Sequence, residues 1–316
     1  MEDIYSEKEH EAIIKEAERY GIKFIDLKSD FGFKYVFGTK GREPELLKLI
    51  NCILPDKHIV SVELGPQEQV GDRPDARKVI YDIHCTTDAG TLVDIEIQRS
   101  EKDDFGKRMV CYSSFAIRNS LNRGVKDYDE IPEIYVIGIL DFIMPGVEDN
   151  TELINHYSLR NDREGRITLT DTVHYVTVEL PKFTKQLNEL KSDADEMWYL
   201  FRYLNKMKER PKELMDKNLD NIFEVSKFAG MKAEDQDRYF RELMYEMDQR
   251  ASLRTAHRRG VTEGEARGEA RGEARGEARG IIKGKQDVAR EMKAKGFESS
   301  MISELTGLTE EQIAAL

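Results

Sequence analysis

Cysteine is scarce in this chain, which has three in 316 residues. Cys52, Cys85 and Cys111 show none of the paired spacings typical of zinc ligands, and each lies in a segment with an apolar pattern. They also lack the density of a disulfide framework in a small secreted domain. We therefore expect reduced thiols in the core of a cytoplasmic protein, with neither disulfides nor a zinc site.

Long apolar runs are missing as well. No stretch approaches the roughly 18 apolar residues that a membrane-spanning helix needs. The first twenty residues are charged and have helical spacing, without the apolar region of a signal peptide. The sequence therefore predicts a protein without a membrane segment.

An excess of basic charge is also absent, because the formal net charge is −12. This balance argues against non-specific affinity for nucleic acid over the whole surface. It does not exclude a local basic groove, since net charge governs solubility and association more than the composition of one site. The length allows one sizeable domain with appendages, or two domains.

The most informative segment that is present is residues 79–98, VIYDIHCTTDAGTLVDIEIQ. Apolar and polar side chains alternate on both sides of residues 88–90, a pattern that predicts two strands in a hairpin. Gly90 suits the positive φ of a three-residue loop. A loop centred on Ala89 also fixes the pairing register of the two strands.

This register brings polar side chains together on one face of the hairpin. Asp82 faces Glu96 and His84 faces Asp94, at the Cβ separation of about 4.5 to 5.5 Å of opposed residues, and Gln98 follows on the same face. Opposed like charges destabilise a sheet unless a proton, solvent or a cation compensates them. Magnesium is commonly held by one or two carboxylates with water and phosphate. The hairpin alone leaves a solvated outer face and a cation site equally open.

The order of the other predicted elements indicates an α/β fold. We expect helices at 5–20, 44–54 and 103–124, and strands at 58–64, 133–142, 154–160 and 173–180. The segment 133–142 is almost entirely apolar, as in a strand covered on both faces. Residues 182–255 have helical spacing, with Trp198 and other aromatic side chains expected in the core. These elements predict a mixed sheet that is flanked by helices and followed by a helical C-terminal region.

Four copies of Gly-Glu-Ala-Arg occupy residues 264–279, and the glycine period extends over 260–284. Each glycine costs an isolated helix roughly 1 kcal/mol relative to alanine, and the repeat pairs like charges at i, i+4. The repeat is therefore either a flexible linker or an association helix. In the second case its glycines would allow close approach of another helix, with right-handed winding.

The tail from Lys285 onward predicts three short helices. Gly296 and Gly307 are signals for helix ends, and Thr309 with Gln312 forms a capping box. The layout is similar to a helix-turn-helix. Because the final helix is short, we expect a small packing or dimerisation module instead.

These segments together resemble the Rpn family of recombination-promoting nucleases, also described as PD-(D/E)xK nuclease family transposases. The matching pieces are DFGFKYVFG at 30–38, the Asp82 strand, IEIQ at 95–98, Arg108 with Tyr112, EIYVIGILDF at 133–142, ELPKF at 179–183 and the glycine-rich repeats. The resemblance implies a restriction-endonuclease-like fold that cleaves DNA phosphodiester bonds with Mg²⁺ or Mn²⁺. It also implies links to recombination, with mobile-element biology and phage defence both open.

The resemblance further assigns residues to the site. Asp82 matches the motif aspartate and Glu96 the acidic residue of the (D/E)xK strand, so both are expected to bind the metal. Gln98 occupies the lysine position, and Asp30 matches an acidic position near the first helix. For Asp30, capping of the segment that follows is the competing interpretation.

The glutamine at position 98 leaves the general base unassigned. A neutral amide can orient water or phosphate, but it cannot supply the positive charge of a lysine. Lys34 and Lys78 are candidate sources of that charge. Arg108 could contact phosphate with support from Tyr112, although packing of their helix on the sheet competes with this role.

We expect five parts in the chain: an N-terminal helix at 1–25, a nuclease-like domain at 26–185, a helical region at 186–255, the repeat at 256–284 and a helical tail at 285–316. The predicted function is a metal-dependent DNA endonuclease of low sequence specificity. The alternative is a non-catalytic, oligomeric DNA-binding or regulatory protein derived from the same fold. The expected partners are DNA and further copies of the chain, joined through the C-terminal helical region.

Overall fold

A computed structural model of the chain describes residues 7–69, 79–101, 104–122, 127–146, 148–163, 165, 168–214 and 219–316. The chain forms two compact units, with the boundary between Met244 and Tyr245. No helix within the described ranges is long and apolar enough to span a bilayer.

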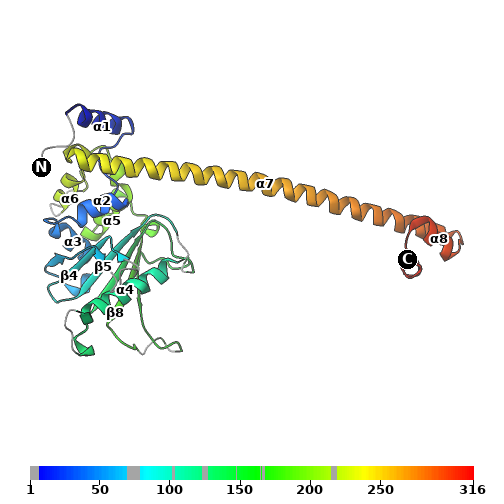
Figure 1. Cartoon of the computed structure of the whole chain (residues 1–316), viewed down its shortest axis with the longest axis horizontal. Coiled ribbons are helices and arrows are strands. Elements are labelled where there is room, and N and C mark those ends of the chain that lie inside the picture. Colours follow the sequence, from blue (N-terminus) through cyan, green and yellow to red (C-terminus); the bar gives the residue numbers. More distant parts are fainter. Residues whose placement is uncertain are drawn as a thin grey trace. The chain divides into compact units, whose positions relative to one another are not determined.

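The first unit is built on a six-stranded mixed sheet with the strand order β1-β4-β5-β6-β8-β7. Figure 1 labels three of these strands, β4, β5 and β8. Its strands are β1 (Val62–Leu64), β4 (Ile83–Thr87), β5 (Leu92–Gln98), β6 (Ile134–Leu140), β7 (Ile154–Ser158) and β8 (Val173–Glu179). Strands β5, β6 and β8 are parallel, and the other neighbours are antiparallel. The carboxyl ends of the three parallel strands therefore meet at one edge of the sheet. A separate ribbon pairs β2 (Glu68–Gln69) with β3 (Val79–Ile80).

Helix α4 (Phe105–Asn122) covers one face of the sheet (Figure 1). Met109, Tyr112 and Ala116 are buried against strands β5, β6 and β8, in the helical spacing that the sequence predicts. The close approach depends on Gly138 of β6, because a Cβ at this position would lie 2.7 Å from the Phe105 ring. Strand β6 is buried along its whole length, which confirms that both of its faces are covered.

Helices on the opposite face bury the larger core. They are α2 (Asp30–Phe37), α3 (Glu43–Ile53) and α5 (Asp193–Tyr203), which pack with the alternate side chains of β4 and β5. Trp198 is 2% exposed, as expected for a core aromatic residue. The unit also contains α1 (Glu7–Arg19), α6 (Asp220–Val225), the beginning of α7 (Ala233–Ala294) and the short 3-10 helices Pro55–Lys57, Tyr128–Glu130, Leu180–Lys182, Leu187–Glu189, Leu204–Lys206 and Phe228–Gly230.

Strands β4 and β5 form the predicted hairpin in the predicted register. His84 pairs with Asp94, and Ile83 pairs with Ile95. Gly90 has a φ of 81°, as its place in the loop requires. The expectation of one continuous strand from residue 79 is wrong, because β3 and β4 are separate strands.

Carboxylate contacts cause this interruption at Tyr81 and Asp82. The Asp82 N–H donates to Oε1 of Glu96 at 3.2 Å, and the Ile97 N–H donates to Oδ2 of Asp82 at 2.9 Å. The ring of Tyr81 packs against Tyr112 on the α4 face. Tyr81 therefore lies on the α4 face, whereas Ile83 and Cys85, which alternation would place on the same face as Tyr81, pack in the opposite core.

The N-terminus of α2 differs from the expectation that Asp30 caps it. Ser29 is the cap, and its Oγ accepts the Gly32 N–H at 2.9 Å. Asp30 is the first helical residue, with a side chain that is 60% exposed. Only glycine fits at position 32, because a Cβ there would lie 2.1 Å from the carbonyl oxygen of Asp26.

All three cysteines lie in the described ranges and are free thiols. Cys85 is buried and Cys52 is half-buried, as expected for thiols in or near the core. Cys111 is exposed on α4, so its assignment to the core is wrong. The helix buries the face on which Met109 and Tyr112 lie, and about 100° per residue places residue 111 outside this face.

The second unit contains most of α7, together with α8 (Ser299–Thr306) and α9 (Glu310–Ala314). The whole Gly-Glu-Ala-Arg repeat is helical and lies within α7. The first of the three helices expected in the tail is the end of α7 and not a separate helix.

The helix ends of the tail follow the predicted signals. Gly296 and Gly307 have positive φ values of 84° and 70°. Thr309 and Gln312 form both hydrogen bonds of the capping box. A small core packs α8 and α9 onto the end of α7, through Ala289, Ile302, Leu308 and Ile313.

Candidate active site

The polar face of the hairpin is buried. Asp82, His84, Asp94 and Glu96 are 8%, 2%, 0% and 2% exposed, because they lie on the side of the sheet that α4 covers. The solvated outer face that the alternation allowed is therefore wrong. Buried charges need partners, so the contacts of each side chain identify what this face can do.

Asp82 lies where the hairpin meets α2. Its Oδ1 is 3.0 Å from Nζ of Lys34, and its Oδ2 accepts the N–H of Ile97. Burial raises the pKa of Asp82 above its ordinary value, against the opposing effects of the Lys34 charge and the Ile97 N–H. The carboxylate is thus held in place by a cation and a backbone donor.

Glu96 is the second carboxylate of the pair. Its Oε1 accepts the Asp82 N–H at 3.2 Å, and its Oε2 is 3.5 Å from Nη2 of Arg108. Burial, followed by the negative charge of Asp82, raises the pKa of Glu96 to about 8. Two neighbouring carboxylates do not both ionise readily, so a nearby cation would stabilise the form in which both are ionised.

Lys34, a residue of α2, contacts two acidic side chains. Its Nζ lies 2.6 Å from Oδ1 of Asp30 and 3.0 Å from Oδ1 of Asp82. Burial alone would lower the pKa of Lys34, but the two carboxylates outweigh it and the pKa is raised. Lys34 is therefore a fixed positive charge and not a base. The other candidate, Lys78, lies outside the described residues.

Arg108 provides a second cation from α4. Its Nη1 donates to Oε1 of Gln98 at 3.3 Å, and its Nη2 donates to the hydroxyl of Tyr112 at 2.7 Å. Tyr112 therefore both packs α4 on the sheet and orients Arg108. The structure brings together the four sequence-predicted residues Asp30, Asp82, Glu96 and Gln98. Lys34 contacts Asp82 and Arg108 contacts Glu96.

His84 and Asp94 form a separate pair on the same face. Nδ1 of His84 lies 2.5 Å from Oδ1 of Asp94. The ring of His84 stacks on Tyr81, and a Cβ at Gly65 would lie 2.5 Å from its Cδ2. These tight contacts indicate a packed structural pair and not an open ligand site.

Asp82 and Glu96 fit a magnesium site of the type that water and phosphate complete. Magnesium usually retains several waters and takes one or two protein carboxylates. Three-residue or larger groups of His, Cys, Asp and Glu that could hold a metal ion do not occur in the described part of the chain. Burial raises the pKa of both carboxylates, and the charge of Asp82 adds to the rise at Glu96, so a divalent cation here would favour their ionised forms.

The beginning of α7 also contributes to this region, although no sequence pattern indicated it. Glu242 accepts the N–H of Phe31 at 2.9 Å, and the hydroxyl of Tyr239 accepts the N–H of Asp26 at 2.9 Å. Both contacts join segments that are more than two hundred residues apart. Only the tertiary structure could show that α7 supports the helix of Asp30 and Lys34.

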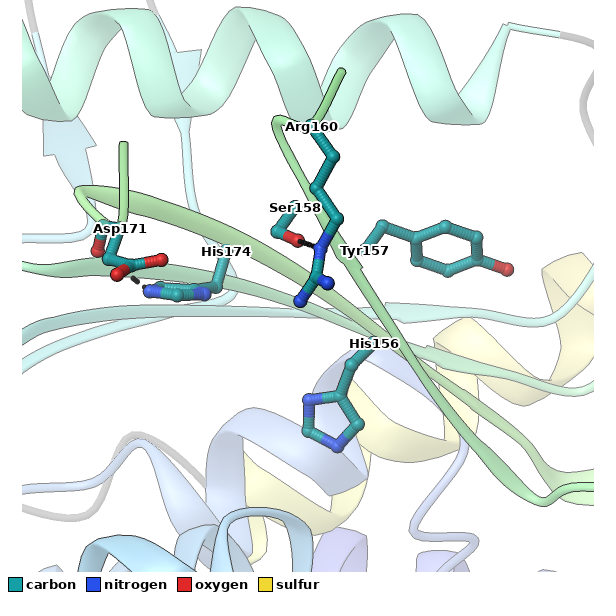
Figure 2. A pocket seen from close by; sticks show the side chains of 6 residues that line it. All are labelled: His156, Tyr157, Ser158, Arg160, Asp171 and His174. Atoms are coloured by element: carbon teal, nitrogen blue, oxygen red, sulfur yellow. Dashed lines mark hydrogen bonds between the residues drawn. The ribbon is translucent and has the colours of Figure 1, made fainter. Parts of the chain in front are cut away.

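Another pocket lies at the other end of the parallel strands (Figure 2). Arg160 donates from Nε to Oγ of Ser158 at 2.7 Å, and Nε2 of His174 lies 2.8 Å from the Asp171 carbonyl oxygen. His174 stands near the start of β8, whereas Glu96 and Gln98 are near the end of the parallel strand β5. This pocket is therefore not part of the candidate active site.

Comparison with known proteins identifies a family. A family model described as "PD-(D/E)XK nuclease family transposase" matches residues 27–256. This range includes all four predicted site residues, both flanking cations and the beginning of α7. Neither the curated proteins nor the solved structures include a significant match.

Proposed function

The chain belongs to the PD-(D/E)XK nuclease family of transposases, and from this premise we propose that it hydrolyses DNA phosphodiester bonds with a divalent cation at Asp82 and Glu96. Nucleases of this family generally use divalent metals. When bound, Mg²⁺ or Mn²⁺ would polarise the scissile phosphate and lower the pKa of an attacking water.

The observation that carries this proposal is the buried pair of carboxylates at the hairpin. Oε1 of Glu96 is 3.2 Å from the backbone nitrogen of Asp82, and the pKa of Glu96 is raised to about 8. Such pairs are costly to bury without a compensating cation. Lys34 and Arg108 each contact one carboxylate of the pair, and a divalent cation there would add further positive charge.

Each of the residues around the carboxylate pair has its own role in this proposal. Lys34 supplies the positive charge that Gln98 lacks, and Asp30 acts by positioning Lys34. Because Arg108 donates to the amide oxygen of Gln98, the amide nitrogen is the end that can donate to a phosphate oxygen or water. We therefore expect low sequence specificity, because these groups would contact phosphate oxygens and not the edges of the bases.

A plasmid assay tests this function. Supercoiled DNA is incubated with the full chain and Mg²⁺, Mn²⁺ or Ca²⁺, beside Asp82→Ala and Glu96→Ala. We expect nicking by the wild type with Mg²⁺ or Mn²⁺. Each variant should lose at least roughly 100-fold in rate, the order seen when one group that stabilises transition-state charge is removed. Nicking that persists in both variants would refute the assignment of the site.

The second candidate is a non-catalytic, oligomeric DNA-binding or regulatory protein derived from the same fold. Gln98 lies where the family motif has lysine, which leaves the general base of the nuclease unassigned. The same assay separates the two, because absence of nicking by the wild type with every metal would support the second candidate. For the endonuclease, we propose a cytoplasmic role in recombination, mobile-element activity or phage defence.

We also propose that copies of the chain associate through the repeat helix. The glycines from Gly264 to Gly284 face open space, because a Cβ added at any of them would have no heavy atom within 4 Å. About 100° per residue places the glutamate row and the arginine row on either side of the glycine row. Two parallel helices that meet at these glycines would oppose glutamates of one copy to arginines of the other. The antiparallel arrangement would oppose like charges.

A further inference from the structure

The beginning of α7 lines a pocket beside the candidate active site. The pocket has a volume of about 590 Å³, within the usual range of ligand sites. Its wall combines α2, the turn that follows α2, Gln67 and side chains of α7. Lys34 belongs to this wall and contacts Asp82, so the pocket adjoins the carboxylate pair.

Contacts with α2 fix this part of α7 in position. Tyr239 is 3% exposed, and its ring lies 6.0 Å from that of Phe31. Glu242 accepts the N–H of Phe31 in the first turn of α2, where the helix dipole favours a negative charge. Arg238 holds its guanidinium 5.5 Å above the centre of the Phe31 ring. The contact with the Phe31 ring thus orients the guanidinium group of Arg238.

Among the cations that line the pocket, Arg238 differs from Lys34 and Arg241 in its ion-pair partners. The cations of the wall are Lys34, Arg238 and Arg241, and its acids are Asp30, Asp235 and Glu242. Lys34 is paired with Asp30, and Arg241 lies 2.6 Å from Asp237. None of the carboxylates in the described ranges forms an ion pair with Arg238. An exposed arginine in a pocket without a carboxylate partner is suited to a phosphate.

We propose that Arg238 binds a phosphate of the DNA strand next to the one that is cleaved. This proposal rests on the nuclease function and adds α7 to the substrate-binding surface. The strand backbone is the occupant, because the pocket is continuous with the carboxylate pair through Lys34. Phosphate contacts of this kind set the register of DNA without reading its sequence.

The experiment measures DNA binding separately from cleavage. Full-length wild type, Arg238→Ala and Arg238→Gln are titrated with a labelled duplex in Ca²⁺ over a series of salt concentrations. Each variant should bind about tenfold more weakly, as expected for one lost charged hydrogen bond. The slope of log K against log salt should decrease by about 1. Arg238→Lys retains the charge and should retain the slope.

Arg250→Ala is the matched control, since Arg250 is another exposed arginine of α7 with an i, i+4 ion pair to Glu246. Its slope should equal that of the wild type. Wild-type slopes in both neutral variants of Arg238, or equal losses in the control, would overturn the proposal. A different result would be that the wild type binds DNA with this dependence on Arg238 but shows no cleavage in any of the metals tested. That result would refute the proposed nuclease function alone.

Discussion

Lys34 Nζ lies 3.0 Å from Oδ1 of Asp82, so a lysine of helix α2 meets the aspartate of the hairpin that we propose as a metal ligand. The strand position where the family motif has lysine is occupied by Gln98. The charge that Gln98 lacks is, in our proposal, supplied by Lys34 from a different element of the fold. This relationship leads to the first prediction.

Exchange of Lys34 for methionine should abolish most of the nuclease activity while the fold is kept. We expect a loss of roughly 100-fold, because one charge-stabilising group is removed. Lys34→Arg should retain more activity. Plasmid nicking rates measure the effect, and Lys57→Met is the matched control, since Lys57 forms a 2.6 Å ion pair with Glu133 elsewhere.

A second-site change makes this test sharper. If Lys34 replaces the motif lysine, Gln98→Lys should restore part of the activity of Lys34→Met. Failure of the double variant to exceed Lys34→Met would count against the replacement.

The stability of the metal-free chain should fall as pH rises from about 4.5 towards about 8. The pKa of Glu96 is raised from 4.5 to about 8, so the unfolded chain loses this proton at a lower pH than the folded chain does. The protonated form therefore stabilises the fold at low pH, and this contribution disappears through pH 8. Thermal unfolding in a chelator should show the decline in the wild type, and a smaller one in Glu96→Gln. Identical pH profiles would refute the assignment.

Divalent cations should reverse that loss of stability. Metal ligands must be deprotonated, so binding at Asp82 and Glu96 releases protons and is stronger at higher pH. Addition of Ca²⁺ or Mn²⁺ at pH 8 should raise the Tm of the wild type, by an amount that grows with cation concentration. Asp82→Asn and Glu96→Gln should show little change. An equal shift in all three proteins would mean that the cation binds elsewhere.

Removal of one partner from the His84–Asp94 pair should destabilise the fold strongly. His84→Leu leaves the fully buried Asp94 without its 2.5 Å partner. Loss of about 3 to 5 kcal/mol is expected for a broken buried pair, whereas replacement of both partners by apolar residues costs less. Urea unfolding of His84→Leu, Asp94→Leu and the double variant measures this. A double variant no more stable than either single one would contradict the prediction.

Deletion of residues 256–316 should lower the oligomeric mass without unfolding the first unit. The first unit has its own core, and the deletion removes the repeat and the small core of the tail. Light scattering measures the mass, and circular dichroism monitors the fold. An unchanged mass would argue against association through the repeat.

Local patterns predicted those parts of the fold that depend on neighbouring residues. The loop at Gly90 was sufficient to fix the pairing of His84 with Asp94. The break at Tyr81 was not predictable, because it results from contacts of Asp82 with Glu96 and Ile97 in the folded hairpin. Cap position likewise depended on one residue, with Ser29 in the place expected for Asp30.

Long-range contacts account for most of what the sequence did not predict about the site. Alternation showed that Asp82 and Glu96 share a face, but not that α4 buries it. The family resemblance supplied the roles of these residues. Neither source of information indicated Arg238 and Glu242, because their place beside α2 depends on how α7 begins against the core.

The helical state of the repeat gives its copy number a geometric meaning. Each Gly-Glu-Ala-Arg unit adds about 6 Å along the α7 axis and about 40° beyond a full turn. Gain or loss of one unit would preserve every residue of the active site. It would nevertheless rotate the residues that follow by a fixed step around the helix. In the association that we propose, variation in the number of units would therefore change the rotational phase at which copies of the chain meet, without a change in the candidate active site.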